Sequence, residues 1–201
     1  MDIVLASQSP RRRALLQQLG VSFTVAVSNI EEHISNKKDI KLQIKELALR
    51  KAWDVSKDFT EGIIVGADTL VVKDGKPLGK PRNYSEAKSM LTMLSGTTHQ
   101  VITGVALVML PKRNTLVDSM VTSVTFRGLT EEEIEGYLST GEYVDKAGAY
   151  GIQGRGAALV KGIEGCYFNV VGLPLGKLTE MLGCMGVKVL GRGTNGKGNS
   201  D

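Results

Sequence analysis

Hydrophobic and polar positions along this chain follow two periods, and the order in which the periods appear predicts an α/β fold. The apolar run at residues 3–6 predicts a strand near the N-terminus. Ser9 can cap a helix that follows, its inner face is made by the leucines at positions 15, 16 and 19, and Gly20 ends it. A strand, a turn and a helix in this order are typical of α/β proteins.

The same reading covers the rest of the chain. It predicts strands at residues 23–27, 63–72, 77–78, 99–109, 116–126, 158–163 and 167–171, and helices at 42–55, 87–94, 130–138 and 175–182. The sequence GAD interrupts the strand at 63–72, and the pair Asp74–Gly75 predicts a hairpin turn after it. Strands and helices alternate early, whereas the middle of the chain is hairpin-like. We therefore expect a mixed sheet with flanking helices and a second lobe.

Composition limits the class of protein. With 201 residues, 42% of them hydrophobic, the chain can bury a core, and we expect a single domain at residues 1–190 followed by a loose Gly-, Asn- and Ser-rich tail at 191–201. No apolar run approaches the roughly 20 residues of a membrane span. Cys166 and Cys184 are the only cysteines and form no CxxC pair, which fits a reducing compartment. These features predict a cytoplasmic protein without a membrane partner.

The net charge of +4 suggests an anionic partner, either a nucleic acid or a phosphorylated small molecule. Only 5% of the residues are aromatic and they form no cluster for base stacking, which disfavours a nucleic-acid-binding module. A regulatory role through a protein partner is a further alternative, and the sequence leaves it open.

Several charged side chains occupy positions where a structural role is unexpected. Arg11, Arg12 and Arg13 fall in the first turn of the first predicted helix, where the helix dipole disfavours cations. A polyphosphate bound by the free N–H groups of that turn could offset the cost. The alternative is a solvated charged turn, and Arg13, beside the apolar stripe, is the expected bystander.

Asp68 and Lys51 lie among apolar residues. Asp68 sits within IIVGADTLVV, where a metal ion or a lysine could stabilise its carboxylate; alternatively it is a turn residue that bonds its own backbone. Lys51 shares the apolar face of the helix predicted at 42–55, from which it can extend to water or bind a phosphate.

Two further segments are candidates for the same chemistry. Lys80 lies in a loop stiffened by Pro77 and Pro81, which suits either a fixed anion or a plain exposed charge. Glu31 and Glu32 are a solvated pair or, together with Asp68, the hard oxygen ligands that Mg²⁺ or Mn²⁺ prefers. His33 and His99 are too scattered for a histidine metal site, and we interpret His99 as structural.

Taken in order, these segments resemble the Maf family of nucleotide pyrophosphatases, which includes proteins named for inhibiting septum formation. The matching motifs are LASQSPRR from Leu5, the acidic pair at Glu31, Lys51, GADT from Gly66, GKP from Gly79, LSGTTHQVITGVA from Leu94, DKAGAYGIQG from Asp145 and NVVGLP from Asn169. Each motif alone is weak, but the ordered set over some 170 residues is specific.

The resemblance implies hydrolysis of a nucleoside triphosphate to the monophosphate and pyrophosphate, with a divalent cation. It also implies a homodimer and an elongated two-lobed fold with a central cleft, like that of the inosine triphosphate pyrophosphatases. The combination of Arg11, Thr69, Lys80 and Gln153 resembles the branch that acts on dTTP and UTP, whereas the other branch prefers methylated guanine nucleotides.

The expected roles follow from the resemblance together with the chemistry. Asp68 would bind the metal and orient or deprotonate water, with Glu32 as the second metal ligand. Arg11, Lys51 and Lys80 would hold the triphosphate. The remaining substrate contacts would come from Ser7, Ser9, Arg12 and Thr69, and from Gln153, whose amide can read the edge of uracil or thymine.

Overall fold

The computed structural model describes residues 1–31 and 39–190, in which helices cover both faces of one mixed sheet. The strands are β1 (Ile3–Ala6), β2 (Phe23–Ala26), β3 (Gly62–Lys73), β4 (Lys76–Leu78), β5 (Thr98–Leu110), β6 (Asn114–Phe126) and β7 (Val160–Glu164). The α-helices are α1 (Pro10–Gln18), α2 (Ile40–Ser56), α3 (Tyr84–Leu94), α4 (Glu131–Leu138), α5 (Tyr167–Val171) and α6 (Leu175–Cys184), with short 3₁₀ helices η1 (Ala147–Ala149) and η2 (Gly154–Leu159). The predicted tail at 191–201 lies outside the described residues.

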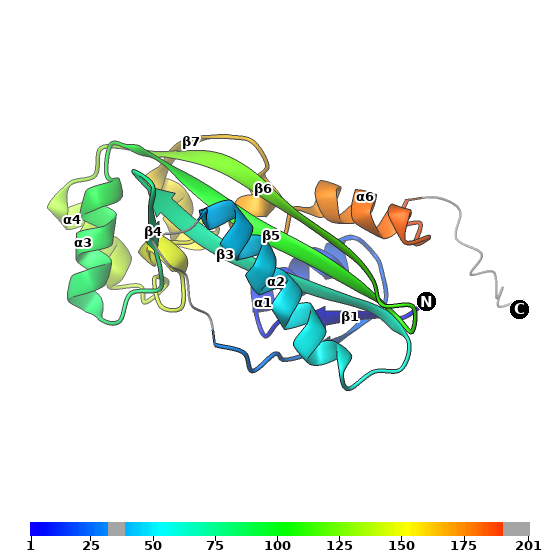
Figure 1. The fold of residues 1–201 in the computed structure, drawn as a ribbon. Coiled ribbons are helices and arrows are strands. Elements are labelled where there is room, and N and C mark those ends of the chain that lie inside the picture. Colours follow the sequence, from blue (N-terminus) through cyan, green and yellow to red (C-terminus); the bar gives the residue numbers. More distant parts are fainter. Residues whose placement is uncertain (32–38, 191–201) are drawn as a thin grey trace, which may run out of the picture.

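The sheet has the order β2-β1-β3-β5-β6-β7. The short strand β4 pairs with the same edge of β3 as β1 does, but further along the strand. Strand β1 is parallel to both β2 and β3, whereas β3, β5, β6 and β7 are successively antiparallel. The long strands β3, β5 and β6 run through the length of an elongated molecule (Figure 1). The predicted α/β class and mixed sheet are confirmed.

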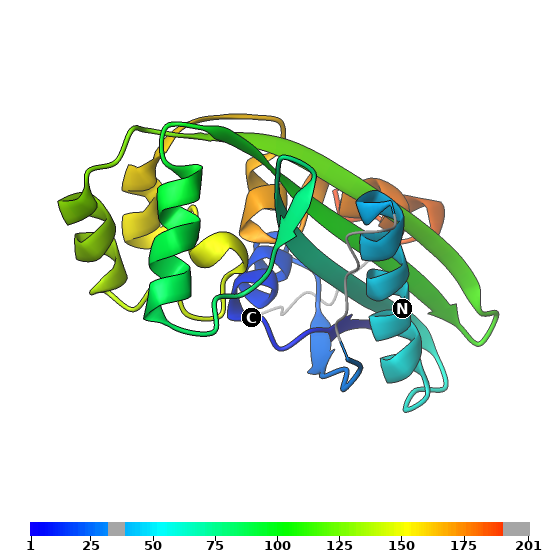
Figure 2. The same cartoon turned by 60° about the vertical axis from the view of Figure 1, so that its left-hand side comes forward.

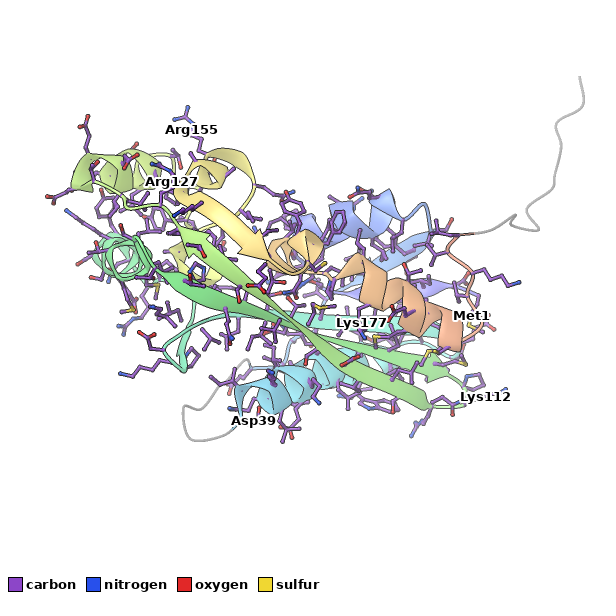
Figure 3. The ribbon with its side chains drawn as sticks, turned by 90° about the horizontal axis from the view of Figure 1, so that it is seen from above. Met1, Asp39, Lys112, Arg127, Arg155 and Lys177 are labelled. Carbon is purple, nitrogen blue, oxygen red and sulfur yellow. The ribbon has the colours of Figure 1, made fainter. Side chains whose placement is uncertain are left out.

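Alternation along β3 builds a core on each side of the sheet. Ile63 and Val65 pack with Leu16 and Leu178 beneath α1 and α6, whereas Ile64 packs with residues of α2 on the other side. Viewed from above, α2 lies on one side of the sheet and α1 and α6 lie on the opposite side (Figure 3). Successive β3 residues therefore face different helices, which decides where each polar side chain of this strand points.

The expected second lobe is the end of the molecule formed by α3, α4 and η1. Helices α3 and α4 lie side by side there (Figure 2). They enclose a second apolar cluster that includes Leu91, Val101, Phe126 and Leu138. Thr130 caps α4 in the predicted way, since its hydroxyl accepts from the Glu133 N–H at 3.2 Å while the Glu133 carboxylate accepts from the Thr130 N–H at 2.9 Å.

Three local predictions are wrong. Residues 167–171 form α5 instead of a strand, although their composition favours β structure; the buried Asn169 side chain anchors this turn by donating to Val101 O at 3.0 Å and Thr122 Oγ1 at 2.9 Å. Strand β3 continues unbroken through GAD. Strand β7 begins at Val160, because the preceding residues form η2.

No helix in the described residues is both long and apolar enough to cross a bilayer.

His99 lies in the core of the second lobe, where 2% of its surface is exposed. Its Nε2 is hydrogen-bonded to the Tyr150 hydroxyl at 2.7 Å, and its ring meets those of Phe126 and Tyr150 edge to face. Burial, with a smaller contribution from the charge of Lys73, lowers the pKa of His99 from 6.5 to about 4. The ring is therefore neutral in the folded protein at neutral pH.

We expect the fold to lose stability in acid through His99. Between about pH 6.5 and 4 the imidazole of His99 is protonated in the unfolded chain but stays neutral in the folded protein. The free energy of unfolding therefore falls by on the order of 3 kcal/mol as the pH is lowered through this range. His99→Gln keeps a neutral partner for Tyr150 and removes this dependence. Urea titrations at several pH values should give a flatter profile for the variant; parallel profiles would contradict the assignment.

Candidate functional site

A gap in one edge of the sheet lies at a cleft that brings several of the predicted site residues together. Strand β1 pairs with β3 only as far as Gly66, and β4 pairs with it only from Val71 onward. Residues 67–70 of β3 have no strand partner on that edge within the described part of the chain. The cleft at this gap has a volume of about 930 Å³ and is lined by the start of α1, β3, the Lys80 loop and residues 144–153. It lies at the carboxyl end of β1, a common place for ligands in α/β sheets.

Two glycines allow α2 to lie directly against the sheet. A Cβ atom at Gly66 would come within 2.1 Å of Ala48 O, and one at Gly104 within 2.4 Å of Ile44 O. Neither distance is possible for a real side chain, so the backbone of α2 contacts β3 and β5 only because both positions are glycine. This close packing fixes the height of α2 above the strands.

The packing places the Lys51 ammonium against the Asp68 carboxylate. Lys51 Nζ donates to Asp68 Oδ1, and the two side chains are 9% and 12% exposed. Asp68 lies in the middle of β3, so its interpretation as a turn residue is wrong and its partner is a lysine. Because a buried ion pair gains little net stability, a pair that lines a cleft points to chemistry.

The N-terminus of α1 forms one wall of the cleft. Ser9 is its N-cap and accepts from the Arg12 N–H at 3.5 Å, while the Ser7 hydroxyl accepts from the Ser9 N–H at 3.2 Å. The arginines separate by burial: Arg11 is half-buried and lines the cleft, whereas Arg13 is exposed and lies outside the lining.

Arg12 turns inward and joins α1 to the chain after α5. Its Nε donates to Gly172 O at 2.8 Å, Nη2 to Thr69 Oγ1 at 2.9 Å and Nη1 to Ser7 Oγ at 3.3 Å. Gly172 is the C-cap of α5, where carbonyl groups lack helical partners and a cation is favoured. The tertiary fold therefore provides a counterpart for this arginine, in addition to any bound phosphate.

The opposite wall is a glycine-rich segment held by one carboxylate. Glu142 accepts from the backbone N–H groups of Arg155 and Gly156 at 3.1 and 3.3 Å. Gly148 N donates to Gly79 O at 3.0 Å and so joins this segment to the Lys80 loop.

Lys80 and Gln153 are exposed on these two loops and both line the cleft.

Lys146 is a cleft residue to which the sequence analysis assigned no role. Its Nζ donates to Glu142 O, and its side chain covers Gly151. Burial lowers the pKa of Lys146, and the positive charge of Arg11 lowers it further. The motif DKAGAYGIQG contains Lys146, so the sequence did offer a signal that this lysine belongs to the site.

Only some of the predicted metal ligands lie in the described part of the chain. Glu32 and His33 lie outside the described residues, and Glu31 is exposed at the edge of that gap. Residues 1–31 and 39–190 contain no group of three or more His, Cys, Asp or Glu side chains suited to a metal. Asp68 is the buried carboxylate of the cleft, and Asp145 lines it from an exposed position. Mg²⁺ needs only one or two carboxylates when substrate phosphates complete its shell, so this donor set fits.

Fold and cleft together define an α/β protein with a cation-lined site for an anionic ligand. The chain belongs to the Maf family, because the family model described as Maf-like protein matches residues 2–185.

Two relatives show how close the similarity is. The dTTP/UTP pyrophosphatase of Moorella thermoacetica is 53% identical over 190 residues, covering 94% of this chain and 98% of the relative. That of Symbiobacterium thermophilum is 51% identical over 181 residues, covering 90% and 92%.

A solved nucleoside-triphosphatase, dITP/XTP pyrophosphatase, from Mycobacterium abscessus gives a TM-score of 0.42 at 17% identity, covering 70% of this chain and 95% of that one.

The glycine contacts predict the effect of a single methyl group. Gly66→Ala should push α2 off the sheet, destabilise the fold by about 3 kcal/mol and separate Lys51 from Asp68. Gly176→Ala is the control, because a Cβ there meets nothing within 4 Å and alanine favours the helix. Thermal melts should distinguish the two variants; equal stability would show that α2 has room to move.

Proposed function

We propose that this chain hydrolyses dTTP and UTP to the monophosphate and pyrophosphate. The observation that carries the proposal is the buried Lys51–Asp68 pair in a cation-lined cleft of a Maf-family chain. The two relatives described above carry the name dTTP/UTP pyrophosphatase.

The cations of the cleft match the charge of a triphosphate. Arg11 lies at the N-terminus of α1 on one wall, and Lys80 lies on the loop opposite. Between them, the free N–H groups of the first helical turn favour an anion. We assign the β- and γ-phosphates to these groups, because charge on the pyrophosphate leaving group increases as its bond to the α-phosphorus breaks.

We propose Mg²⁺ or Mn²⁺ as the cofactor, with Asp68 as a ligand and Glu32 as the second. When bound, the cation would neutralise phosphate charge and lower the pKa of a coordinated water. Support comes from the position of Asp68, whose carboxylate is the buried acid of the cleft and leaves one oxygen beyond the contact with Lys51.

Asp68 also orients the attacking water or accepts its proton. The water oxygen forms a bond to the α-phosphorus, the bond from that phosphorus to the bridging oxygen breaks, and the electron pair leaves with pyrophosphate. Lys51 holds Asp68 from the α2 side and supplies a positive charge close to the reacting phosphate.

Gln153 is proposed to read the base. Its side chain is exposed on the loop that Glu142 anchors, and a primary amide offers both a donor and an acceptor to the edge of uracil or thymine.

Four expectations stay predictions: a homodimer, a cytoplasmic location, the absence of a nucleic-acid partner, and a single domain that ends at residue 190. A cytoplasmic location is supported by the two cysteines, which are both free.

The products decide the proposed function. With Mg²⁺ or Mn²⁺ the purified protein should convert dTTP to dTMP and pyrophosphate, and UTP to UMP and pyrophosphate, and EDTA should stop both reactions. Chromatography of the nucleotides together with a pyrophosphate assay measures this. Release of orthophosphate with dTDP or UDP would refute the assignment, as would turnover that is indifferent to EDTA.

Asp68→Asn should abolish hydrolysis while leaving dTTP binding largely intact. It keeps the shape of the side chain but removes the charge proposed to hold the metal and activate water, so kcat should fall about 10²- to 10⁴-fold. Asp118→Asn is the matched control, because it changes another strand carboxylate that lies outside the cleft and pairs with Lys177 at 3.0 Å. Near wild-type kcat in Asp68→Asn would remove this residue from the chemistry.

A further inference from the structure

A buried chain of hydrogen bonds behind the cleft leads from α5 to Thr69. Thr103 on β5 and Asn169 on α5 are both completely buried, and Thr103 Oγ1 lies 3.0 Å from Asn169 O and 3.0 Å from Thr69 Oγ1. Thr69 is half-buried and lines the cleft. A hydroxyl has one proton to donate and two lone pairs that accept, so the direction of each bond can be worked out.

The donor and acceptor of each of these hydrogen bonds follow from the backbone carbonyl of Asn169. Asn169 O is a carbonyl oxygen in the last turn of α5 and only accepts, so Thr103 must donate its proton there. Thr103 is then left with lone pairs, and Thr69 must be the donor in the bond between the two hydroxyls. The longer contact of Thr69 with Gly172 O, at 3.4 Å, also requires Thr69 to donate inward.

The bond with Arg12 agrees with this direction. Arg12 Nη2 donates to Thr69 Oγ1 at 2.9 Å, because a guanidinium has no lone pair to offer. The proton of Thr69 is therefore used inside the protein, and one lone pair accepts from Arg12. Because Thr69 also lines the cleft, its second lone pair is the hydrogen-bonding capacity that it keeps for a ligand there.

We propose that Thr103 is a positioning residue that makes Thr69 an obligatory hydrogen-bond acceptor toward the substrate. A group with only acceptors, such as a phosphate oxygen, cannot bond to Thr69 in this state. Uracil and thymine carry a proton on N3, whereas cytosine has a bare lone pair there. Thr69 then accepts from the N3–H of the pyrimidine and rejects cytosine by opposing lone pairs. This inference rests on the proposed function.

The main test is Thr103→Val, which keeps the shape of the buried side chain and removes its hydroxyl. Thr69 then loses its nearer acceptor, at 3.0 Å, and keeps only the longer contact with Gly172 O at 3.4 Å, so its proton is held inside the protein less strongly and can turn toward the cleft. The ratio of kcat/KM for UTP over CTP should fall about tenfold, mainly through KM. Thr103→Ser retains the hydroxyl and should keep the wild-type ratio.

Thr122→Val is the matched control for a purely structural effect. Thr122 is also fully buried, and its hydroxyl holds α5 through Cys166 O at 3.1 Å and Asn169 Nδ2 at 2.9 Å, but it makes no bond to Thr69. Its loss should lower thermal stability and leave the UTP/CTP ratio unchanged. An unchanged ratio in Thr103→Val, or an equal fall in Thr122→Val, overturns the proposal.

A measurement on the unaltered enzyme covers the case in which Thr103→Val does not fold. In 3-deaza-UTP a carbon replaces N3, so kcat/KM should be about tenfold below that for UTP. Equal efficiency overturns the acceptor role of Thr69 while UTP hydrolysis, and with it the proposed function, stands. Failure of the wild-type enzyme to release pyrophosphate from UTP overturns the proposed function itself, and the inference with it.

Discussion

The close contact of α2 with the sheet is the constraint on which the site depends. Gly66 and Gly104 remove the side chains that would hold the helix away, and the helix backbone then lies on β3 and β5. At that height, Lys51 on the inner face of α2 meets Asp68 on the α2-facing side of β3. The pair is costly to desolvate, so the fold must hold both partners rigidly. Its location next to the gap between β1 and β4 makes this charge pair available to a ligand.

The other side of β3 has a separate polar system. Thr69 follows Asp68 directly and therefore faces α1 and α5, where Arg12, Gly172 and Thr103 surround its hydroxyl. One unpaired stretch of strand thus presents an acid from one face of the sheet and a hydroxyl from the other. In the proposed function Asp68 acts at the phosphate, and in the further inference Thr69 contacts the base.

Local sequence patterns were informative wherever burial follows a regular period. They identified the strand at 3–6, the cap at Ser9, the capping box at Thr130, and the inward position of Lys51 on its helix. They also marked Asp68 as a carboxylate that needs a partner. These features depend on residues a few positions apart, because helix and strand periodicity and end-capping are local properties.

The tertiary structure decided what depends on distant residues. The arginine run alone does not show that Arg12 turns inward, because its partner Gly172 O is 160 residues away. Residues 167–171 have the composition of a strand and became α5 because Asn169 bonds to β5 and β6. Burial lowers the pKa of Lys146, and the charge of Arg11 on the opposite wall of the cleft lowers it further, so this shift depends on how distant segments pack. The sequence by itself determined which side chains are charged and which face of an element they occupy. Only packing determined which of them meet, since contact between distant segments depends on how the whole sheet and its helices fit together.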